Sequence, residues 1–244
     1  MLELLGLPPE ASAHAAEIDR VIVLLHWLMA VLAAGWGAFF LYTLVRFRRG
    51  ANPVARREGI TAGWSTYVEA AVVLSEVVIL VFFSIPAYSA RVTGFPNAME
   101  ATEVRVVAEQ FAWNVHYPGA DRTFGRTDIR LVSSENPIGL DRKDPAAADD
   151  VVSVNQFNIP LGRPVIVHLT SKDVIHSFGL PQMRVKQDAI PGMVHDLWFT
   201  PTRTGDWEIV CSQLCGLGHY RMRGFYSVQA PEAFTAWLRE AATP

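Results

Sequence analysis

The sequence has little of several features that define common functional classes. Only two of its 244 residues are cysteines, and no C-x-x-C-H motif occurs, which excludes a covalently attached c-type haem. It contains no phosphate-binding loop, dinucleotide fingerprint or basic nucleic-acid patch, so no nucleic-acid partner is expected. Internal repeats are also lacking. The net charge of -3 is too small to indicate a class of partner.

Two long apolar segments stand out against this background. Residues 21–45 carry no charge, and as a helix they would reach roughly 37 Å, enough to cross a bilayer. Residues 67–87 are mostly Val, Ile, Leu and Phe but include Glu69 and Glu76, which predicts a spanning helix whose polar positions face protein. Residues 1–87 are therefore expected to form an N-terminal segment and a transmembrane helical hairpin.

Charge predicts how this hairpin is oriented in a membrane. The linker between the helices is rich in arginine, and the N-terminal segment is acidic and does not resemble a secretory signal peptide. Arginines in short loops stay on the cytoplasmic side, so both chain ends should face outward. We expect a multi-pass protein of the bacterial inner membrane with residues 88–244 in the periplasm. The linker arginines are Arg46, Arg48, Arg49, Arg56 and Arg57, and the N-terminal acidic residues are Glu3, Glu10, Glu17 and Asp19.

The remaining residues have the pattern of an all-β domain. Alternating apolar runs separated by Pro, Gly and Asp clusters predict the strands of a sandwich. Residues 133–150 lack an apolar period and are expected to be a solvated loop. Near the C-terminus, Phe234, Trp237 and Leu238 follow Pro231 at helical spacing, which predicts a short packed helix. The predicted strands include "EVRVVAEQFAWNVHY", "DIRLVS", "PVIVHLT", "HDLWFTP", "DWEIV" and "GFYSV".

Both cysteines lie in one short stretch, "CSQLCGLGHYRM", at residues 211–222. In an oxidising compartment the simplest interpretation of Cys211 and Cys215 is a disulfide, and two cysteines with two histidines would satisfy a zinc site. Neither uses Met222, whereas thiolate, imidazole and a weak thioether are typical copper ligands. One cysteine suffices for a mononuclear copper site, and two could bridge a pair of copper ions. A second histidine besides His219 is then needed, from among His116, His168, His176 and His195.

Several motifs together resemble subunit II of the haem-copper cytochrome c oxidases. They are "DVIHSFGLP", "KQDAIPGM" and "CSQLCGLGHYRM", together with the two-helix anchor and the aromatic stretch "QFAWNVHYPG" at residues 110–119. The resemblance implies a cupredoxin-like domain that holds CuA, a binuclear copper centre. It further implies that Cys211 and Cys215 bridge the coppers, that His176 and His219 bind one each, and that Met222 and the carbonyl of Gln213 are axial ligands.

The resemblance also implies a function for the whole chain. CuA accepts electrons from cytochrome c or a similar periplasmic donor and passes them to haem in subunit I. Oxygen is reduced there, coupled to proton translocation, so this chain belongs to an enzyme but performs no oxygen chemistry. The expected partners are subunit I, subunit III, the electron donor and membrane lipid.

The chain departs from the family pattern between the two cysteines. Where the family usually has a glutamate that reaches a magnesium ion at the subunit I contact, this chain has Gln213. A carbonyl ligand to copper survives that change, but a neutral amide is a weaker ligand for a hard cation, so the magnesium site is in doubt. Asp173 and Asp188 could orient the histidines or could be plain turn residues.

Other residues match family positions for electron and proton entry. Phe111 falls where the family has the aromatic at which electrons arrive, Trp113 follows it, and core packing is the alternative for both. Glu69 falls where the family has a carboxylate at the mouth of a proton channel, and Glu76 has no assigned role. Acidic residues could steer a basic donor or only aid solubility; they are Glu109, Asp141, Asp144, Asp149 and Asp150.

Three alternatives to the oxidase remain at this point. A quinol-oxidising relative would have the same fold but lack the copper ligands, all of which are present here. A CuA subunit of a nitric oxide reductase, or a free-standing membrane copper carrier, would share the ligand loop. A disulfide-stapled binding module would leave the His and Met spacing to chance. The anchor and the "DAIPG" segment favour the oxidase.

Overall fold

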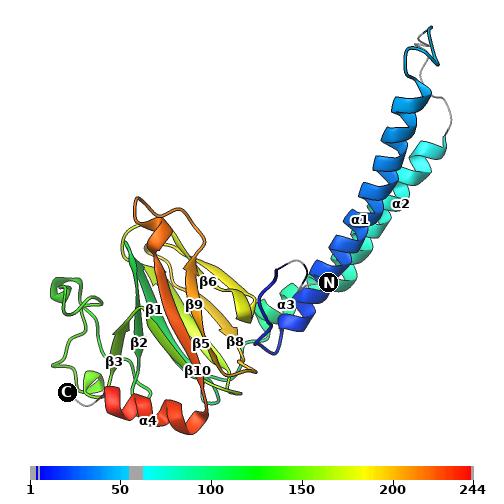
Figure 1. The fold of residues 1–244 in the computed structure, drawn as a ribbon. Coiled ribbons are helices and arrows are strands. Elements are labelled where there is room, and N and C mark those ends of the chain that lie inside the picture. Colours follow the sequence, from blue (N-terminus) through cyan, green and yellow to red (C-terminus); the bar gives the residue numbers. More distant parts are fainter. Residues whose placement is uncertain (1–3, 5, 55–62, 243–244) are drawn as a thin grey trace. The chain divides into compact units, whose positions relative to one another are not determined.

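The computed structural model describes residue 4, residues 6–54 and residues 63–242 (Figure 1). Three of the charged residues that predict the membrane orientation, Glu3, Arg56 and Arg57, lie outside the described residues. The chain divides into two compact units, one with Glu17–Ala90 and the other with Gly6–Ala16 and Arg91–Pro244. The second unit is a β-sandwich, and the N-terminal stretch Gly6–Ala16 belongs to it.

The first unit is a hairpin of two long helical segments. α1 spans Ala15–Arg46 and begins six residues before the predicted apolar core of the helix. The second segment comprises α2 (Trp64–Ile79), a π-helical turn η2 (Leu80–Ser84) and α3 (Ile85–Thr93). The π turn ends two residues before Pro86, which lacks the backbone N–H that a regular helix needs, so the hydrogen-bond ladder shifts there.

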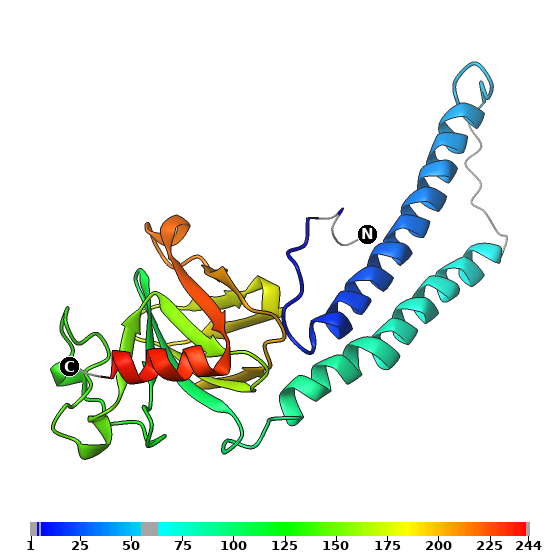
Figure 2. The same cartoon turned by 60° about the horizontal axis from the view of Figure 1, so that its bottom comes forward.

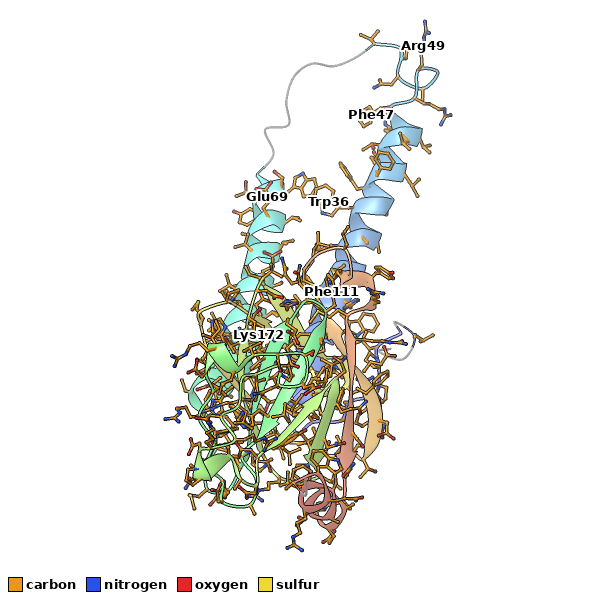
Figure 3. All side chains as sticks on the ribbon, turned by 90° about the vertical axis from the view of Figure 1, so that its left-hand side faces the viewer. Trp36, Phe47, Arg49, Glu69, Phe111 and Lys172 are labelled. Carbon is orange, nitrogen blue, oxygen red and sulfur yellow. The ribbon has the colours of Figure 1, made fainter. Side chains whose placement is uncertain are left out.

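Both helical segments are long and apolar enough to cross a membrane, and no residue in the most apolar part of either segment is buried within the chain. Figure 3 shows Trp36 on α1 and Glu69 near the start of α2, with Phe47 and Arg49 beyond the end of α1. Trp36 and Phe47 are exposed. Such faces are expected of helices whose solvent is lipid or another membrane subunit.

The second unit contains ten strands in two five-stranded sheets, in the orders β3-β2-β1-β5-β8 and β4-β10-β9-β6-β7. Both sheets mix parallel and antiparallel pairs, because β1 runs parallel to β5 and β10 parallel to β4. The strands are β1 (Thr102–Glu109), β2 (Ala112–Tyr117), β3 (Val151–Val154), β4 (Gln156–Pro160), β5 (Val165–Ser171), β6 (His176–Leu180), β7 (Val185–Ala189), β8 (His195–Phe199), β9 (Gly205–Cys211) and β10 (Arg223–Gln229).

The core of the sandwich lies between the two sheets. On β1, Val104, Val106 and Ala108 alternate with outward residues and are fully buried, as a strand with one core face requires. α4 (Pro231–Ala241) lies against the sandwich (Figure 2). Its Phe234 is buried, and Trp237 and Leu238 pack on the same core, which confirms the predicted C-terminal helix.

Two local predictions between β2 and β3 are wrong. The run "DIRLVS" is not a strand, because Ile129–Leu131 forms a 3-10 turn, η3, capped by the side chain of Asp128. Residues 133–150 are not a fully solvated loop, because Ile138, Leu140 and Ala147 bury themselves in a small second core. A second 3-10 turn, η4 (Pro145–Ala147), lies within this excursion. The few apolar residues of this segment contact the outer face of the sheet. They are irregularly spaced in the sequence, so no helical or strand periodicity predicted their burial.

Candidate metal centre

The pairing of three strands brings the ligand candidates together. β6 pairs with β9 so that Phe178 lies opposite Cys211, which places His176, at the start of β6, beside Cys211 at the end of β9. β9 and β10 are antiparallel neighbours, and the ligand loop joins them. In Figure 1 this is the orange connection at the top of the sandwich. The end of the ligand loop at Met222 therefore lies close to its beginning at Cys211.

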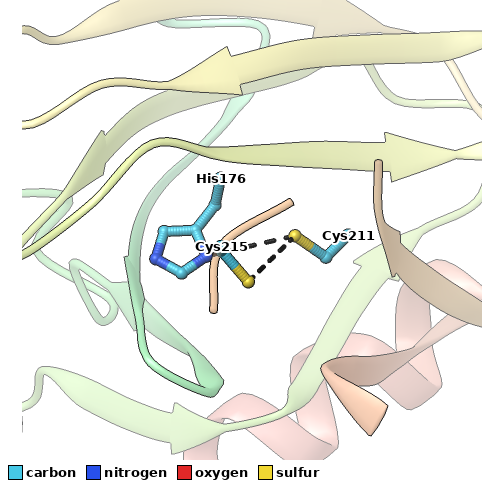
Figure 4. Close-up of side chains that lie close together, drawn as sticks. All are labelled: His176, Cys211 and Cys215. Carbon is cyan, nitrogen blue, oxygen red and sulfur yellow. Dashed lines mark hydrogen bonds between the residues drawn. The ribbon is translucent and has the colours of Figure 1, made fainter. Parts of the chain in front are cut away.

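The two thiols and one imidazole form a compact cluster (Figure 4). The sulfurs of Cys211 and Cys215 are 3.8 Å apart, and both cysteines are free. The Nδ1 atom of His176 lies 4.0 Å from the Cys211 sulfur. Potential ligand atoms of these three residues all lie within 4.8 Å of one another. The disulfide between Cys211 and Cys215, one of the alternatives that the sequence allowed, is therefore not formed in this structure.

The other predicted ligands adjoin this cluster. His219 lies in the short turn η6 (His219–Arg221), and its Nδ1 is 3.5 Å from the sulfur of Cys215. The sulfur of Met222 is 3.1 Å from Nδ1 of His176 and 3.6 Å from the sulfur of Cys215. The carbonyl oxygen of Gln213 is 3.2 Å from the Cys211 sulfur. The six donor groups thus form one connected cluster, in which each lies within 4.0 Å of another.

Electrostatics at the site favour one thiolate and one thiol in the metal-free chain. Burial would raise the pKa of Cys211, but hydrogen bonds with His176 and with the backbone of Ser177 and Gln213 outweigh it and lower that pKa to about 6. Burial and the neighbouring Cys211 raise the pKa of Cys215. A thiolate is the form of cysteine that binds metal, so Cys211 is prepared for binding at neutral pH.

Asp173 fixes the orientation of the His176 ring. Its Oδ1 is 2.9 Å from Nε2 of His176, which leaves Nδ1 to face the sulfurs. Burial opposes a charge on His176, yet hydrogen bonds with Cys211 and Asp173 raise its pKa. This is the usual arrangement of a metal-binding histidine and its outer carboxylate. Asp188, the other candidate for that role, lies 3.6 Å from the ammonium group of Lys186.

The chemistry of the donors fits a copper pair. Two sulfurs that each bind a metal at roughly 2.3 Å can be up to about 4.6 Å apart, so a separation of 3.8 Å allows both to share a metal. Thiolates, imidazoles and a thioether are soft ligands of the kind copper selects. Met222 and Cys215 are nearly fully buried, and His176 is fully buried, so the inner side of the site is shielded from water.

The structure places the remaining candidate residues away from the thiols. His116, His168 and His195 each bond elsewhere, respectively to Asp150 at 2.7 Å, to Asp196 at 2.7 Å and to Gln187 at 2.8 Å. Asp150 is buried in its pair with His116, so its proposed role in steering a donor at the surface is wrong. The side chain of Gln213 is exposed.

The aromatic candidates occupy two different environments. Trp113 is fully buried, and its ring lies 6.2 Å from the His176 ring and 5.3 Å from the ring of Phe178. Phe111 is half-buried at the β1–β2 turn, beside the ligand loop (Figure 3). The sequence did not indicate that the preceding residue, Gln110, also contacts this loop. Its only signal was its place next to an expected electron-entry residue.

A β-sandwich with ligands on adjoining strand ends and one loop defines a cupredoxin-like metal domain. A family model described as "Cytochrome C oxidase subunit II, periplasmic domain" matches residues 102–226. The chain is 35% identical over 235 residues to "Alternative cytochrome c oxidase subunit 2" of Bradyrhizobium diazoefficiens, covering 93% of this chain and 80% of that protein. It is 30% identical to "Cytochrome c oxidase subunit 2" of Cereibacter sphaeroides, covering 98% and 84%.

A solved periplasmic domain of subunit II of the cytochrome oxidase of Bradyrhizobium japonicum is 28% identical, with a TM-score of 0.44, and covers 60% of this chain and 95% of its own. The chain belongs to the cytochrome c oxidase subunit II family. It is therefore a subunit of an oxidoreductase complex. This assignment confirms the oxidase over a nitric oxide reductase subunit or a free-standing carrier.

Proposed function

We propose that this chain holds a CuA centre and relays electrons from a periplasmic donor to haem in subunit I. The observation that carries the proposal is the convergence of six soft or carbonyl donors from two strand ends and one loop. The proposed ligands are His176, Cys211, Gln213, Cys215, His219 and Met222. Bound there, a copper pair would take up and release one electron at a time with little change in geometry.

The residues of the chain supply what such a centre needs from a protein. Asp173 orients His176, and the strand pairing of β6 with β9 fixes the distance between His176 and Cys211. The buried side of the site excludes water. Rigid, preorganised ligands keep the geometry constant between oxidation states, which lowers the reorganisation that electron transfer must overcome.

The outer side of the ligand loop is suited to partner contact. Leu214, Leu217 and Tyr220 are 76%, 97% and 84% exposed, which is unusual for large apolar side chains on a free surface. We propose that subunit I or the electron donor, cytochrome c or a similar protein, covers them. Subunit III and membrane lipid are the expected partners of the helical hairpin, residues 1–87, in a bacterial inner membrane with residues 88–244 in the periplasm.

Copper content tests the proposed centre. We expect the purified full-length chain, loaded with copper, to hold two coppers and to show the spectrum of one unpaired electron shared by both. Cys215→Ser should abolish that spectrum and lower the copper content, because one bridging ligand is lost. Ser212→Ala, an exposed position in the same loop, is the matched control and should change neither. One copper per chain with a single-site spectrum would contradict the proposal.

Electron entry through Phe111 is a separate proposal, supported by the half-buried position of its ring against Gly216 and Gly218 of the ligand loop. Phe111→Leu should slow the reduction of copper by the donor. Trp113 is the alternative entry residue, and its contact with the His176 ring supports it. Trp113→Leu tests it in the same assay, with copper content measured in both variants because the buried tryptophan also packs the core. Unchanged rates in both would exclude this route.

Proton entry at Glu69 is proposed from its place on α2, in the part of the hairpin that follows the arginine-bearing linker (Figure 3). Glu69→Gln should lower oxidase turnover and proton pumping, because an amide cannot carry a proton. Glu76→Gln, seven residues further along α2, is the matched control. Equal effects of the two substitutions would argue against a specific role for Glu69.

A further inference from the structure

The turn between β1 and β2 touches both segments that carry the metal ligands. The side-chain amide of Gln110 donates from Nε2 to the carbonyl oxygen of Cys215 at 2.7 Å. The backbone N–H of the same residue donates to Oδ2 of Asp173 at 2.7 Å. Asp173 in turn bonds His176 through its other oxygen at 2.9 Å. One residue therefore links the ligand loop to the His176 segment through hydrogen bonds alone.

Packing at the same turn leaves the loop little freedom. A Cβ atom added at Gly216 would lie 2.7 Å from Nε2 of Gln110, and one added at Gly218 would lie 2.4 Å from the ring of Phe111. Both separations are shorter than real Cβ contacts allow. The backbone of the loop therefore rests directly on the turn, and Gln110 is the member of the turn that bonds to it.

We propose that Gln110 is a positioning residue that braces Cys215 against the Asp173–His176 pair. The brace holds the second thiol at its place, 3.8 Å from the first, before any metal binds. The inference rests on the proposed function for the identity of the metal, but the brace itself is a property of the metal-free chain. It assigns to Gln110 a role in which its amide N–H, rather than its bulk, is the functional group.

Two substitutions separate the donor from the shape of the side chain. Gln110→Met keeps the length and most of the volume but removes the donor, whereas Gln110→Lys restores a donor. Gln156→Met, at an exposed position on β4, is the matched control. The full-length chain is used in each case. Hydrogen exchange of the amides of residues 212–218 is measured without metal, and release of copper to a chelator is measured after loading.

With Gln110→Met we expect amide exchange in the loop to be faster, and copper release to be faster by up to about tenfold, the factor that one net hydrogen bond represents. The shared-electron spectrum should also broaden, because the bridging sulfur is less fixed. Gln110→Lys should recover most of both effects. Exchange and release equal to those of the unsubstituted chain in Gln110→Met would overturn the proposal, as would an equal loss in Gln110→Lys.

The design distinguishes this inference from the proposed function. If the unsubstituted chain holds no copper pair, the proposed function fails, and loop exchange in the metal-free chain still tests the brace. If Gln110→Met loses its fold, seen as exchange rising throughout the strands, Gln110→Glu provides the second comparison. Its ionised carboxylate has nearly the same shape and no donor, so it should loosen the loop, and a loop as protected as in the unsubstituted chain would refute the proposal.

Discussion

Gly218 shows at the scale of one residue how closely the ligand loop packs. Its φ is ordinary, so it is not required for a left-handed backbone. The ring of Phe111 occupies the space where a Cβ would stand, 2.4 Å away. A glycine is therefore needed here for close approach, and the two glycines of "CGLGH" have a packing role as well as a role in the turn.

Gly218→Ala should displace either the Phe111 ring or the ligand loop. Inserting a carbon into such a contact typically costs about 1–3 kcal/mol. We expect a lower unfolding midpoint and a shifted spectrum of the copper-loaded chain. Gly50→Ala, where an added Cβ would meet nothing within 4 Å, is the control. A Gly218→Ala chain with the original midpoint and spectrum would show that the contact relaxes freely.

The N-terminal stretch Gly6–Ala16 acts as an element of the sandwich. The backbone N–H of Ala11 donates to Gln182 and that of Ala13 to Thr200, so the stretch runs beside the segments near those residues. Ala11 is fully buried in the core, and His14 is buried. Nothing in the composition of residues 1–20 indicates this docking, because it uses backbone bonds.

Docking of this stretch should depend on pH through His14. Burial first, and the charge of Arg91 second, lower the pKa of His14 from 6.5 to about 4. Between pH 6.5 and pH 4 the His14 side chain is protonated in the unfolded chain but not in the folded chain. Its contribution to the free energy of unfolding is therefore fully present above pH 6.5 and is lost as the pH falls toward 4. We expect the unfolding midpoint to fall less steeply over this range in His14→Gln, and equal slopes would contradict the assignment.

The excursion between β2 and β3 is held to the sheet by a buried hydrogen-bonded pair, His116 and Asp150. Oδ2 of Asp150 lies 2.7 Å from Nε2 of His116 and accepts the backbone N–H of Gly125 at 2.8 Å. Desolvation by burial lowers the pKa of His116, although its bond with Asp150 opposes that shift. The ring of Phe124 packs against the ring of His116, and the guanidinium group of Arg105 lies over the ring of Phe124.

Removing the carboxylate should release this excursion. Deleting one partner of a buried hydrogen bond costs about 1–3 kcal/mol, because the other partner is left unsatisfied. Asp150→Ala should therefore lower the free energy of unfolding in urea by that order. Glu208→Ala removes an exposed pair with Arg223 and should change it by less than about 1 kcal/mol. Similar losses in the two variants would show that burial of the first pair contributes little.

At the scale of the whole molecule, the chain combines two helices long and apolar enough to cross a membrane with a cupredoxin-like sandwich. Arg46, Arg48 and Arg49 lie at the end of α1 and just beyond it. The positive-inside rule predicts that they lie in the cytoplasm, and if each helix crosses once, the sandwich is then periplasmic. This predicted arrangement would place the candidate copper site in the compartment where a soluble donor can reach it.

Reporter fusions check this orientation. Alkaline phosphatase is active only outside the cytoplasm, so we expect it to be inactive when fused after Gly50 and active when fused after Ala242. A fluorescent protein that matures only in the cytoplasm should give the opposite pattern. Activity of the phosphatase at Gly50 would reverse the predicted orientation and would remove the basis for a periplasmic donor.

The sequence alone determined the features that depend on local composition and spacing. A charge-free run long enough to span a bilayer predicts a membrane helix, whatever the rest of the fold. Alternation of apolar residues predicts strands such as β1 and β5, and the helical spacing of Phe234, Trp237 and Leu238 predicts α4. The ligand loop was also recognisable, because four candidate ligand side chains lie within twelve residues of sequence and are therefore close in space.

Only the tertiary structure decided which distant groups meet. The pairing of β6 with β9 brings His176 to Cys211 and leaves His116 and His168 elsewhere. The family resemblance pointed to His176, but no local pattern in the sequence specifies which distant strands pair. The bonds of Gln110, the docking of Gly6–Ala16 and the burial of Asp150 have the same origin. Each depends on backbone groups or polar side chains whose partners lie far along the chain. Neither the composition of the sequence nor the spacing of its apolar residues predicts such contacts.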